Sequence, residues 1–188
     1  EYIGPFETVF FYNGDELICS IENTSAHDFG CTEVTVDRNG TGITDFWYLG
    51  NDAKDLADKT IFVDPTNNSP TATYNITLYY TQAEVAGWEA ATGKVFNTEI
   101  QMVKNPGAIS NVNPAAQYPD GTITIDSTTI VTANLGTSTS VGVTASFANG
   151  FSGFGVGDPG PPPATVLPVE NLSLSAQVRD AGVDLTWV

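Results

Sequence analysis

The chain has 188 residues, of which 41% are hydrophobic and 15% are charged. Twenty-two acidic residues against six basic ones give a formal net charge of −16. A chain this acidic repels phosphate groups, so we expect no nucleic-acid partner and no binding to anionic membranes. The sequence also lacks an apolar run close to the roughly 18 residues that a membrane-spanning helix needs, so we expect no membrane insertion.

The composition limits catalytic chemistry as well. The single histidine, His27, is the only available centre for a Ser/His/Asp triad, and a metal site with several histidines cannot be built. His27 precedes Asp28, and such a pair can supply a general base or a metal ligand, although a locally hydrogen-bonded loop histidine is the simpler interpretation. We therefore expect no catalytic activity. Because the chain lacks an initiator Met and a signal peptide, we expect it to begin inside a longer or processed precursor.

The first elements are predicted to be strands separated by tight turns. Residues 6–12 are aromatic and β-branched, and the Asn-Gly-Asp sequence at 13–15 leads into a second apolar stretch at 17–21. Asn-Gly supplies the positive φ angles of a tight turn, so this pattern predicts a β-hairpin. Further short strands are predicted by alternation at 31–37, 61–63 and 73–80, with a turn at 39–42.

One short helix is predicted after these strands. Thr81 and Glu84 have the spacing of a capping box, and Gly93 closes the segment at its other end. We expect two to three turns that lie across a sheet end. Trp88 is interpreted as a core residue of this helix rather than as a platform for a ligand.

The second half continues as sparsely charged β-structure. Strands are predicted at 122–125, 130–133 and 141–147, and a last strand around 151–156. A Pro/Gly-rich linker follows at 157–168. The prediction is an all-β fold: an antiparallel β-sandwich, Ig-like or jelly-roll-like, over 1–156 with one short helix, the linker, and a separate unit at 169–188.

The two cysteines, Cys19 and Cys31, are either free and buried or joined by a disulfide. The chain has the acidic, lysine-poor composition of a secreted protein, and an even cysteine count in that setting favours the disulfide. A nucleophilic cysteine paired with His27 is the weaker interpretation, because no catalytic motif surrounds them.

Carboxylates gather in the middle of the chain. Calcium prefers six to eight oxygen ligands from Asp, Asn, backbone carbonyls and water. The stretch therefore suggests a calcium site, with no other cofactor expected, although it lacks the Asp-x-Asp-x-Asp-Gly spacing of known calcium loops. The alternative is a solvated acidic loop. The candidate ligands are Asp45, Asp52, Asp55, Asp58 and Asp64.

Aromatic residues lie beside this acidic stretch. Trp47 and Tyr48 belong to a Phe-Trp-Tyr cluster. Exposed flat rings stack on the faces of sugars, so these two residues are candidates for glycan binding. The alternative is that the rings fill the core of a domain with few leucines.

Two stretches resemble parts of known families. The sequence LPVE at 167–170, LSLSA at 172–176 and VDLTW at 183–187 resembles the opening of the fibronectin-type-III-like module that precedes the sorting tail in secreted Bacteroidetes proteins. In that module the Trp at the end of the second strand packs the core, and Leu174 stands where the family often has Phe. The resemblance implies that 169–188 holds the first strands of an incomplete module of about seven strands.

Residues 74–89, with 29–31 and 151–154, are similar to a β-rich region near the C-terminal end of large proteins secreted by the type IX system. Some of those proteins carry a metallopeptidase or adhesive repeats further upstream. The resemblance implies a secreted or cell-surface location. Ser127, in an Asp-Ser-Thr sequence, fits the O-glycosylation pattern of Bacteroidetes.

The function expected from these features is a non-catalytic structural or accessory module of a secreted or surface multidomain protein. One alternative is a module that binds glycans or another surface partner, with or without calcium. A further alternative is the accessory C-terminal region of a secreted hydrolase such as a metallopeptidase. The expected partners are other domains of the same polypeptide, components of the type IX secretion system, or surface glycans.

Overall fold

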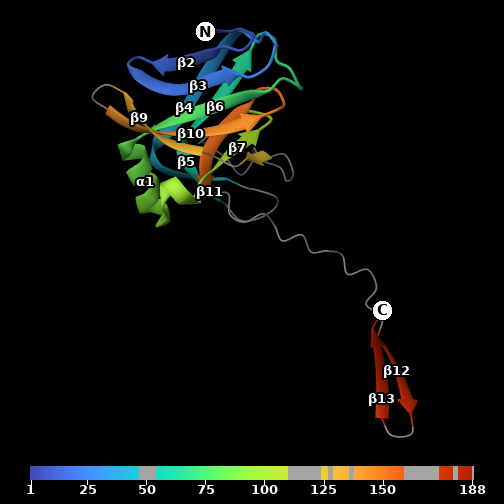
Figure 1. Cartoon of the computed structure of the whole chain (residues 1–188). Coiled ribbons are helices and arrows are strands. Elements are labelled where there is room, and N and C mark those ends of the chain that lie inside the picture. Colours follow the sequence, from blue (N-terminus) through green and yellow to red (C-terminus); the bar gives the residue numbers. More distant parts are fainter. Residues whose placement is uncertain are drawn as a thin grey trace.

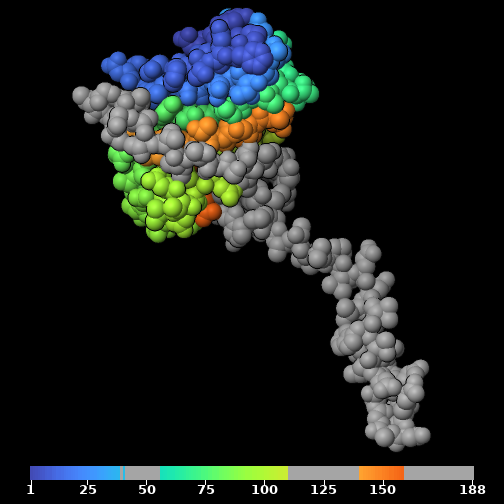
Figure 2. All heavy atoms as spheres, in the orientation of Figure 1, coloured from blue at the N-terminus to red at the C-terminus, as the bar shows by residue number. Residues whose placement is uncertain are grey.

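The computed structural model describes residues 1–46, 54–109, 124–126, 129–135, 138–158, 174–179 and 182–187. Two antiparallel sheets pack face to face, as an all-β sandwich, and a separate two-stranded sheet follows them (Figure 1). The predicted fold class is therefore confirmed. Figure 2 shows the N-terminal strands, in blue, covering one side of the sandwich.

Both sheets combine strands that are distant in sequence. The five-stranded sheet has the order β2 (Thr8–Asn13), β3 (Glu16–Asn23), β6 (Tyr74–Thr81), β10 (Ser138–Phe147) and β9 (Thr129–Leu135). The six-stranded sheet has the order β1 (Tyr2–Ile3), β4 (Gly30–Phe46), β5 (Lys54–Pro65), β11 (Gly153–Asp158), β7 (Gln101–Asn105) and β8 (Thr124–Asp126). The third sheet pairs β12 (Leu174–Arg179) with β13 (Gly182–Trp187).

The core lies between the two large sheets. On β6, alternate side chains point inward because successive residues of a strand face opposite sides. The inward residues are Tyr74, Ile76, Leu78 and Tyr80, and all are buried. The six-stranded sheet contributes a matching apolar row to the same cluster, including Ile61, Val63, Phe154 and Val156.

The predicted hairpin and helix are both confirmed. β2 and β3 pair around a turn in which Gly14 has a φ of 61°, which glycine adopts without steric cost. α1 (Gln82–Thr92) begins with Thr81 as N-cap and a complete capping box, and Gly93 ends it with a φ of 71°. Trp88 is fully buried, as expected.

A four-residue helix, α2 (Phe96–Glu99), follows α1 and was not predicted. It places Phe96 edge-on against Trp88, with ring centroids 5.4 Å apart. The two helices close one end of the sandwich (Figure 1). Among the described residues, no helix combines the length and apolar character needed to span a membrane.

In the middle of the chain one sequence prediction is wrong, and one predicted strand is confirmed but longer than expected. The expected turn at 39–42 is part of β4, which runs on to Phe46 with a register shift between Arg38 and Ile43. Here the Asn-Gly pair marks an irregular position inside a strand, a common use of glycine in sheets. The expected short strand at 61–63 belongs to the twelve-residue β5.

The backbone approach at Gly153 yields a stability prediction. A Cβ on Gly153 would lie 2.3 Å from the carbonyl oxygen of Gly107, so the backbone would have to shift. We expect Gly153→Ala to lower the free energy of unfolding by about 2 kcal/mol, as other overpacked sites do. Gly107→Ala is the matched control: its Cβ meets nothing closer than 3.7 Å, so we expect a change within about 0.5 kcal/mol. Urea denaturation measures both, and equal effects would contradict the argument.

Candidate functional site

A cluster of charged groups lies at the helix-covered end of the sandwich. Arg38 on β4 is directly opposite Lys59 on β5. Both have the parity of Val36 and Ile61, so the two cations lie side by side on the same face of the sheet; 35% of the Arg38 side chain is exposed. Only 1% of the Lys59 side chain is exposed. A buried ammonium requires an acceptor or a counter-charge.

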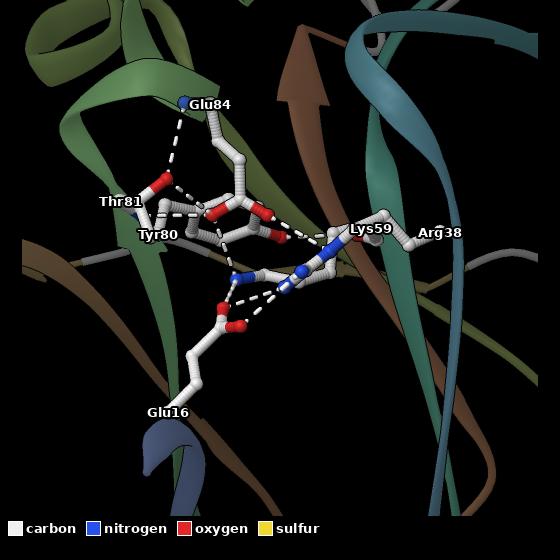
Figure 3. A network of polar contacts seen from close by, with 6 residues as sticks. All are labelled: Glu16, Arg38, Lys59, Tyr80, Thr81 and Glu84. Carbon is white, nitrogen blue, oxygen red and sulfur yellow. Dashed lines mark hydrogen bonds and ion pairs between the residues drawn. The ribbon is translucent and has the colours of Figure 1, made fainter. Parts of the chain in front are cut away.

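Two carboxylates supply the counter-charges (Figure 3). Glu84 Oε2 lies 2.9 Å from Lys59 Nζ, and Glu16 Oε1 lies 3.5 Å from the same nitrogen. Glu16 also accepts two hydrogen bonds from the Arg38 guanidinium, at 2.6 and 3.2 Å. The four residues carry two positive and two negative formal charges, so the cluster is neutral.

The network ties three elements to the six-stranded sheet. Glu16 begins β3, whereas Glu84 lies in the first turn of α1. The Tyr80 hydroxyl donates to the Lys59 carbonyl at 3.3 Å, and its ring lies 4.8 Å from Lys59 Nζ. Glu84 also accepts from the Thr81 amide at 2.8 Å, so one carboxylate both caps the helix and neutralises the lysine.

The geometry shifts the ionisation of these groups. Hydrogen bonds from Arg38 hold the pKa of Glu16 below its usual value, and the same bonds raise the pKa of Arg38. Burial lowers the pKa of Lys59, although Glu84 opposes this shift. Arg38 Nε is 3.2 Å from Glu84 Oε1, an ionic contact that does not satisfy this oxygen with a hydrogen bond.

A second lysine is buried at the opposite end of the core. Lys104 on β7 points between the rings of Tyr74, Phe147 and Phe154, with its nitrogen 5.4 to 6.0 Å from their centroids. Its nitrogen donates to the Asn149 carbonyl at 2.6 Å, to Asn149 Oδ1 at 2.8 Å and to the Gly150 carbonyl at 2.5 Å.

The acceptors of Lys104 are thus all uncharged. Burial lowers the pKa of its amine to about 8. The Tyr74 hydroxyl donates to the same two backbone carbonyls, each at 3.2 Å. Lys104 and Asn149 line a cavity of about 400 Å³ together with Asn68, Pro106 and Ser152. The Ser152 hydroxyl is buried without a hydrogen-bond partner among the described residues.

The predicted disulfide is wrong, because the two cysteines are free. Cys19 lies on β3 of the five-stranded sheet, fully buried, and burial raises the pKa of its thiol to about 12. Cys31 lies on β4 of the other sheet and is exposed. A disulfide needs Cβ atoms that face each other at about 4 Å, which a core-facing and an exposed side chain do not provide.

The predicted calcium ligands do not form one site. Asp58 and Asp64 lie six residues apart on β5, a separation of about 20 Å along a strand. Asp45 and Asp55 are partners in the β4–β5 ladder, and Asp52 lies outside the described residues. Within the described part of the chain, no three acidic, His or Cys side chains gather around a position for a metal ion. The expected acidic loop is largely strand.

His27 lies in the loop between β3 and β4. Its Nε2 is 2.8 Å from the carbonyl oxygen of Asn67, 40 residues further along the chain, and its ring meets Phe29 edge-on. The loop position was expected, but the partner of the ring is not local as predicted. Trp47, Tyr48 and Ser127, the predicted glycan-stacking and glycosylation residues, lie outside the described residues.

Comparisons with known proteins identify no relative of this chain. No protein-family model, curated protein or solved structure matches it.

Sequence reasoning missed both buried lysines. Neither Lys59 nor Lys104 was singled out by a motif or by its charge. The alternation Ala57, Lys59, Ile61, Val63 was a usable signal, since it puts the lysine in phase with an apolar row. The sequence did not show which acceptors would meet it.

The charge network predicts a large cost for removing one carboxylate. Glu84→Gln keeps a side chain that can complete the capping box but leaves Lys59 and Arg38 with one anion between them. We expect the free energy of unfolding to fall by about 2 to 4 kcal/mol. In Lys59→Met/Glu84→Gln, much of this loss should be recovered, because the unpaired buried charge is gone.

Lys94 and Asp158 provide the matched control, an ion pair at 2.7 Å with partly exposed side chains. Asp158→Asn should cost less than about 1 kcal/mol. Urea denaturation at neutral pH measures all four proteins. A Glu84→Gln cost no larger than that of Asp158→Asn would show that the buried network contributes little.

Proposed function

We propose that this chain is a non-catalytic structural or accessory module of a secreted or cell-surface multidomain bacterial protein exported by the type IX secretion system. The observation that carries the proposal is the second β unit. After the sandwich, β12 and β13 pair only with each other, in a sheet separate from the two large ones (Figure 1). Among the described residues, one chain thus carries a β-sandwich and a separate hairpin, which we interpret as the opening of another unit.

The register of this hairpin supports a modular arrangement. Apolar positions are opposite apolar positions, since Leu174 pairs with Trp187 and Ala176 with Leu185. Two strands alone bury too little apolar surface to be stable in water, so a hairpin with this pattern requires further strands. The pattern fits the opening of the fibronectin-type-III-like module that its sequence resembles.

The charge clusters support a structural role for the sandwich. Glu84 caps a helix while it neutralises Lys59, and Lys104 holds the connection between β10 and β11. Both Glu84 and Lys104 thus hold neighbouring elements of the sandwich together. The nearest partners proposed for such a module are the other domains of its own polypeptide. A hydrolase domain in that polypeptide would make this chain its accessory region.

The location can be tested directly in the producing bacterium. Antibodies against the purified chain should label intact cells, and deletion of the type IX translocon should abolish that labelling. A cytoplasmic marker protein, labelled only after lysis, is the control. If the chain behaves like the cytoplasmic marker, the proposal is wrong. If labelling survives deletion of the translocon, the type IX route is wrong.

A glycan-binding role is the second candidate, and the outer face of the five-stranded sheet favours it. Phe10 and Tyr12 on β2 are 47% and 61% exposed, whereas Phe11 between them is buried. Alternate residues of a strand are about 6.8 Å apart, so both exposed rings lie close together on β2, although the pairing of β2 with β3 is irregular between Phe11 and Tyr12. Nearby on the same sheet, the Asn75 amide donates to the Glu22 carboxylate at 2.7 Å.

The chemistry of this face fits a neutral saccharide. Aromatic rings stack on the C–H faces of sugars, and amide and carboxylate groups bond their hydroxyls. The net charge of −16 disfavours sulfated or phosphorylated glycans. This candidate site is argued from β2 and its neighbours alone and does not depend on Trp47, Tyr48 or calcium.

Binding to an array of neutral glycans tests this candidate. Phe10→Ala/Tyr12→Ala should weaken binding at least about tenfold, since each exposed ring contributes of the order of 1 kcal/mol or more. Phe6→Ala is the control, because Phe6 is 69% exposed but lies in a turn outside β2. Absence of binding, or equal binding by both variants, would exclude a glycan site on this face.

A further inference from the structure

The acceptors of Lys104 include a carboxamide as well as backbone carbonyls. Lys104 Nζ lies 2.8 Å from Oδ1 of Asn149 and 2.6 Å from the carbonyl oxygen of the same residue. An amine and a side-chain amide carbon are therefore neighbours at the end of the sandwich core. No carboxylate of the described residues bonds or pairs with this lysine.

We propose that Lys104 and Asn149 form a covalent amide cross-link, in which Lys104 Nζ replaces Nδ2 of Asn149 and ammonia leaves. A bond forms between Nζ and Cγ, and the bond between Cγ and Nδ2 breaks. A proton from Nζ ends on the departing nitrogen. Nothing is oxidised or reduced, and no further reactant enters the balance.

The distances place the reacting atoms close to each other. Because a C=O bond is about 1.2 Å long, Cγ of Asn149 is at most about 4.0 Å from Nζ. Reacting atoms held about 3 to 3.5 Å apart gain the advantage of an intramolecular reaction, so a small movement suffices. Asn68 also holds the connection between β10 and β11. Its side chain donates to the Phe151 carbonyl and accepts from the Phe151 amide.

The surroundings make the amine a nucleophile. A neutral amine attacks a carbonyl, whereas an ammonium does not. Burial among Tyr74, Phe147 and Phe154 lowers the pKa of Lys104 to about 8, so a substantial fraction is neutral near physiological pH.

The hydrogen-bond pattern orients the lone pair of this amine. The ammonium uses three N–H bonds on three acceptors. After deprotonation two N–H bonds remain, and the backbone carbonyls of Asn149 and Gly150 can accept both. The lone pair then lies on the side of the Asn149 carboxamide, and a rotation of that carboxamide brings Cγ in place of Oδ1 toward it. The Tyr74 hydroxyl donates to the same two backbone carbonyls and helps to hold this connection in place.

The cavity of about 400 Å³ that Lys104 and Asn149 line gives ammonia a way out. The product would join β7 to the connection between β10 and β11, closing a loop of 45 residues (149 − 104). This inference is independent of the proposed function, because the cross-link can be present or absent in a structural module, a glycan binder or any other protein.

Intact mass measurement of the denatured, purified full chain tests the proposal. Loss of ammonia lowers the mass by about 17 Da. After incubation at pH 9, where the amine is mostly neutral, we expect near-complete conversion, and the rate should rise with pH through about 8. Lys104→Arg and Asn149→Ala should both retain the unmodified mass. A wild-type chain of unmodified mass after this incubation would overturn the proposal.

A cyclic imide at an Asn-Gly sequence also loses ammonia, so the products must be distinguished. The chain contains the same dipeptide at Asn13-Gly14, in an exposed turn, as an internal control. Trypsin cannot cleave after an acylated lysine, so the cross-linked chain should give one peptide from 95 to 179 instead of 95–104 and 105–179. When the chain is also cleaved before Asp120 and Asp126, the fragment that contains Lys104 should stay joined to the fragment that contains Asn149.

Two outcomes of this mapping would contradict the cross-link. One is a mass loss that maps to Asn149 and persists in Lys104→Arg, and the other is a modified chain that hydroxylamine cleaves at Asn149; both identify an imide. With the cross-link, the melting temperature of the wild type should exceed that of Asn149→Ala by roughly 10 °C, because a long loop is closed in the unfolded chain. Equal melting temperatures with a confirmed 17 Da loss would place the modification elsewhere.

Discussion

A buried ammonium must find acceptors, and this chain buries one toward each end of its core. Lys59 and Lys104 both belong to the six-stranded sheet, whereas their partners come largely from the other side of the sandwich. Tyr80 and Tyr74, at the two ends of β6, contact one lysine each. The sheets are therefore fixed relative to each other at two points. Sliding one sheet over the other would separate both lysines from their acceptors. Apolar contacts alone would not prevent such sliding.

The features predicted from sequence were those whose cause lies within a few residues. Thr81 and Glu84 form a capping box because a helix start needs local acceptors, and Gly14 turns the hairpin because of its own φ angle. The core row of β6 followed from alternation. Arg38 and Lys59 were missed because their juxtaposition depends on the β4–β5 register, which the irregularity after Arg38 shifts. No local pattern determines that register.

The cysteines illustrate the same limit. Cys19 and Cys31 are close in sequence, and an even count favoured a bond. The structure places them on different sheets because the intervening chain crosses from β3 to β4, which leaves one thiol in the core and the other at the surface. The prediction of a calcium site in the acidic stretch was wrong for a related reason. The composition suggested a loop, but Asp58 and Asp64 lie far apart along the strand β5.

The two lysines differ in their acceptors, and that difference gives them different chemistry. Lys59 meets carboxylates, which hold it as a cation in a neutral cluster. Lys104 meets only neutral oxygens, so it loses its proton more readily and has a carboxamide within reach. Its position matters mechanically, because β11 is the last sandwich strand before the second β unit. Tension along the chain would peel β11 from its Asp158 end toward Gly153, and a bond from Lys104 to Asn149 would stop the peeling before it reached β10.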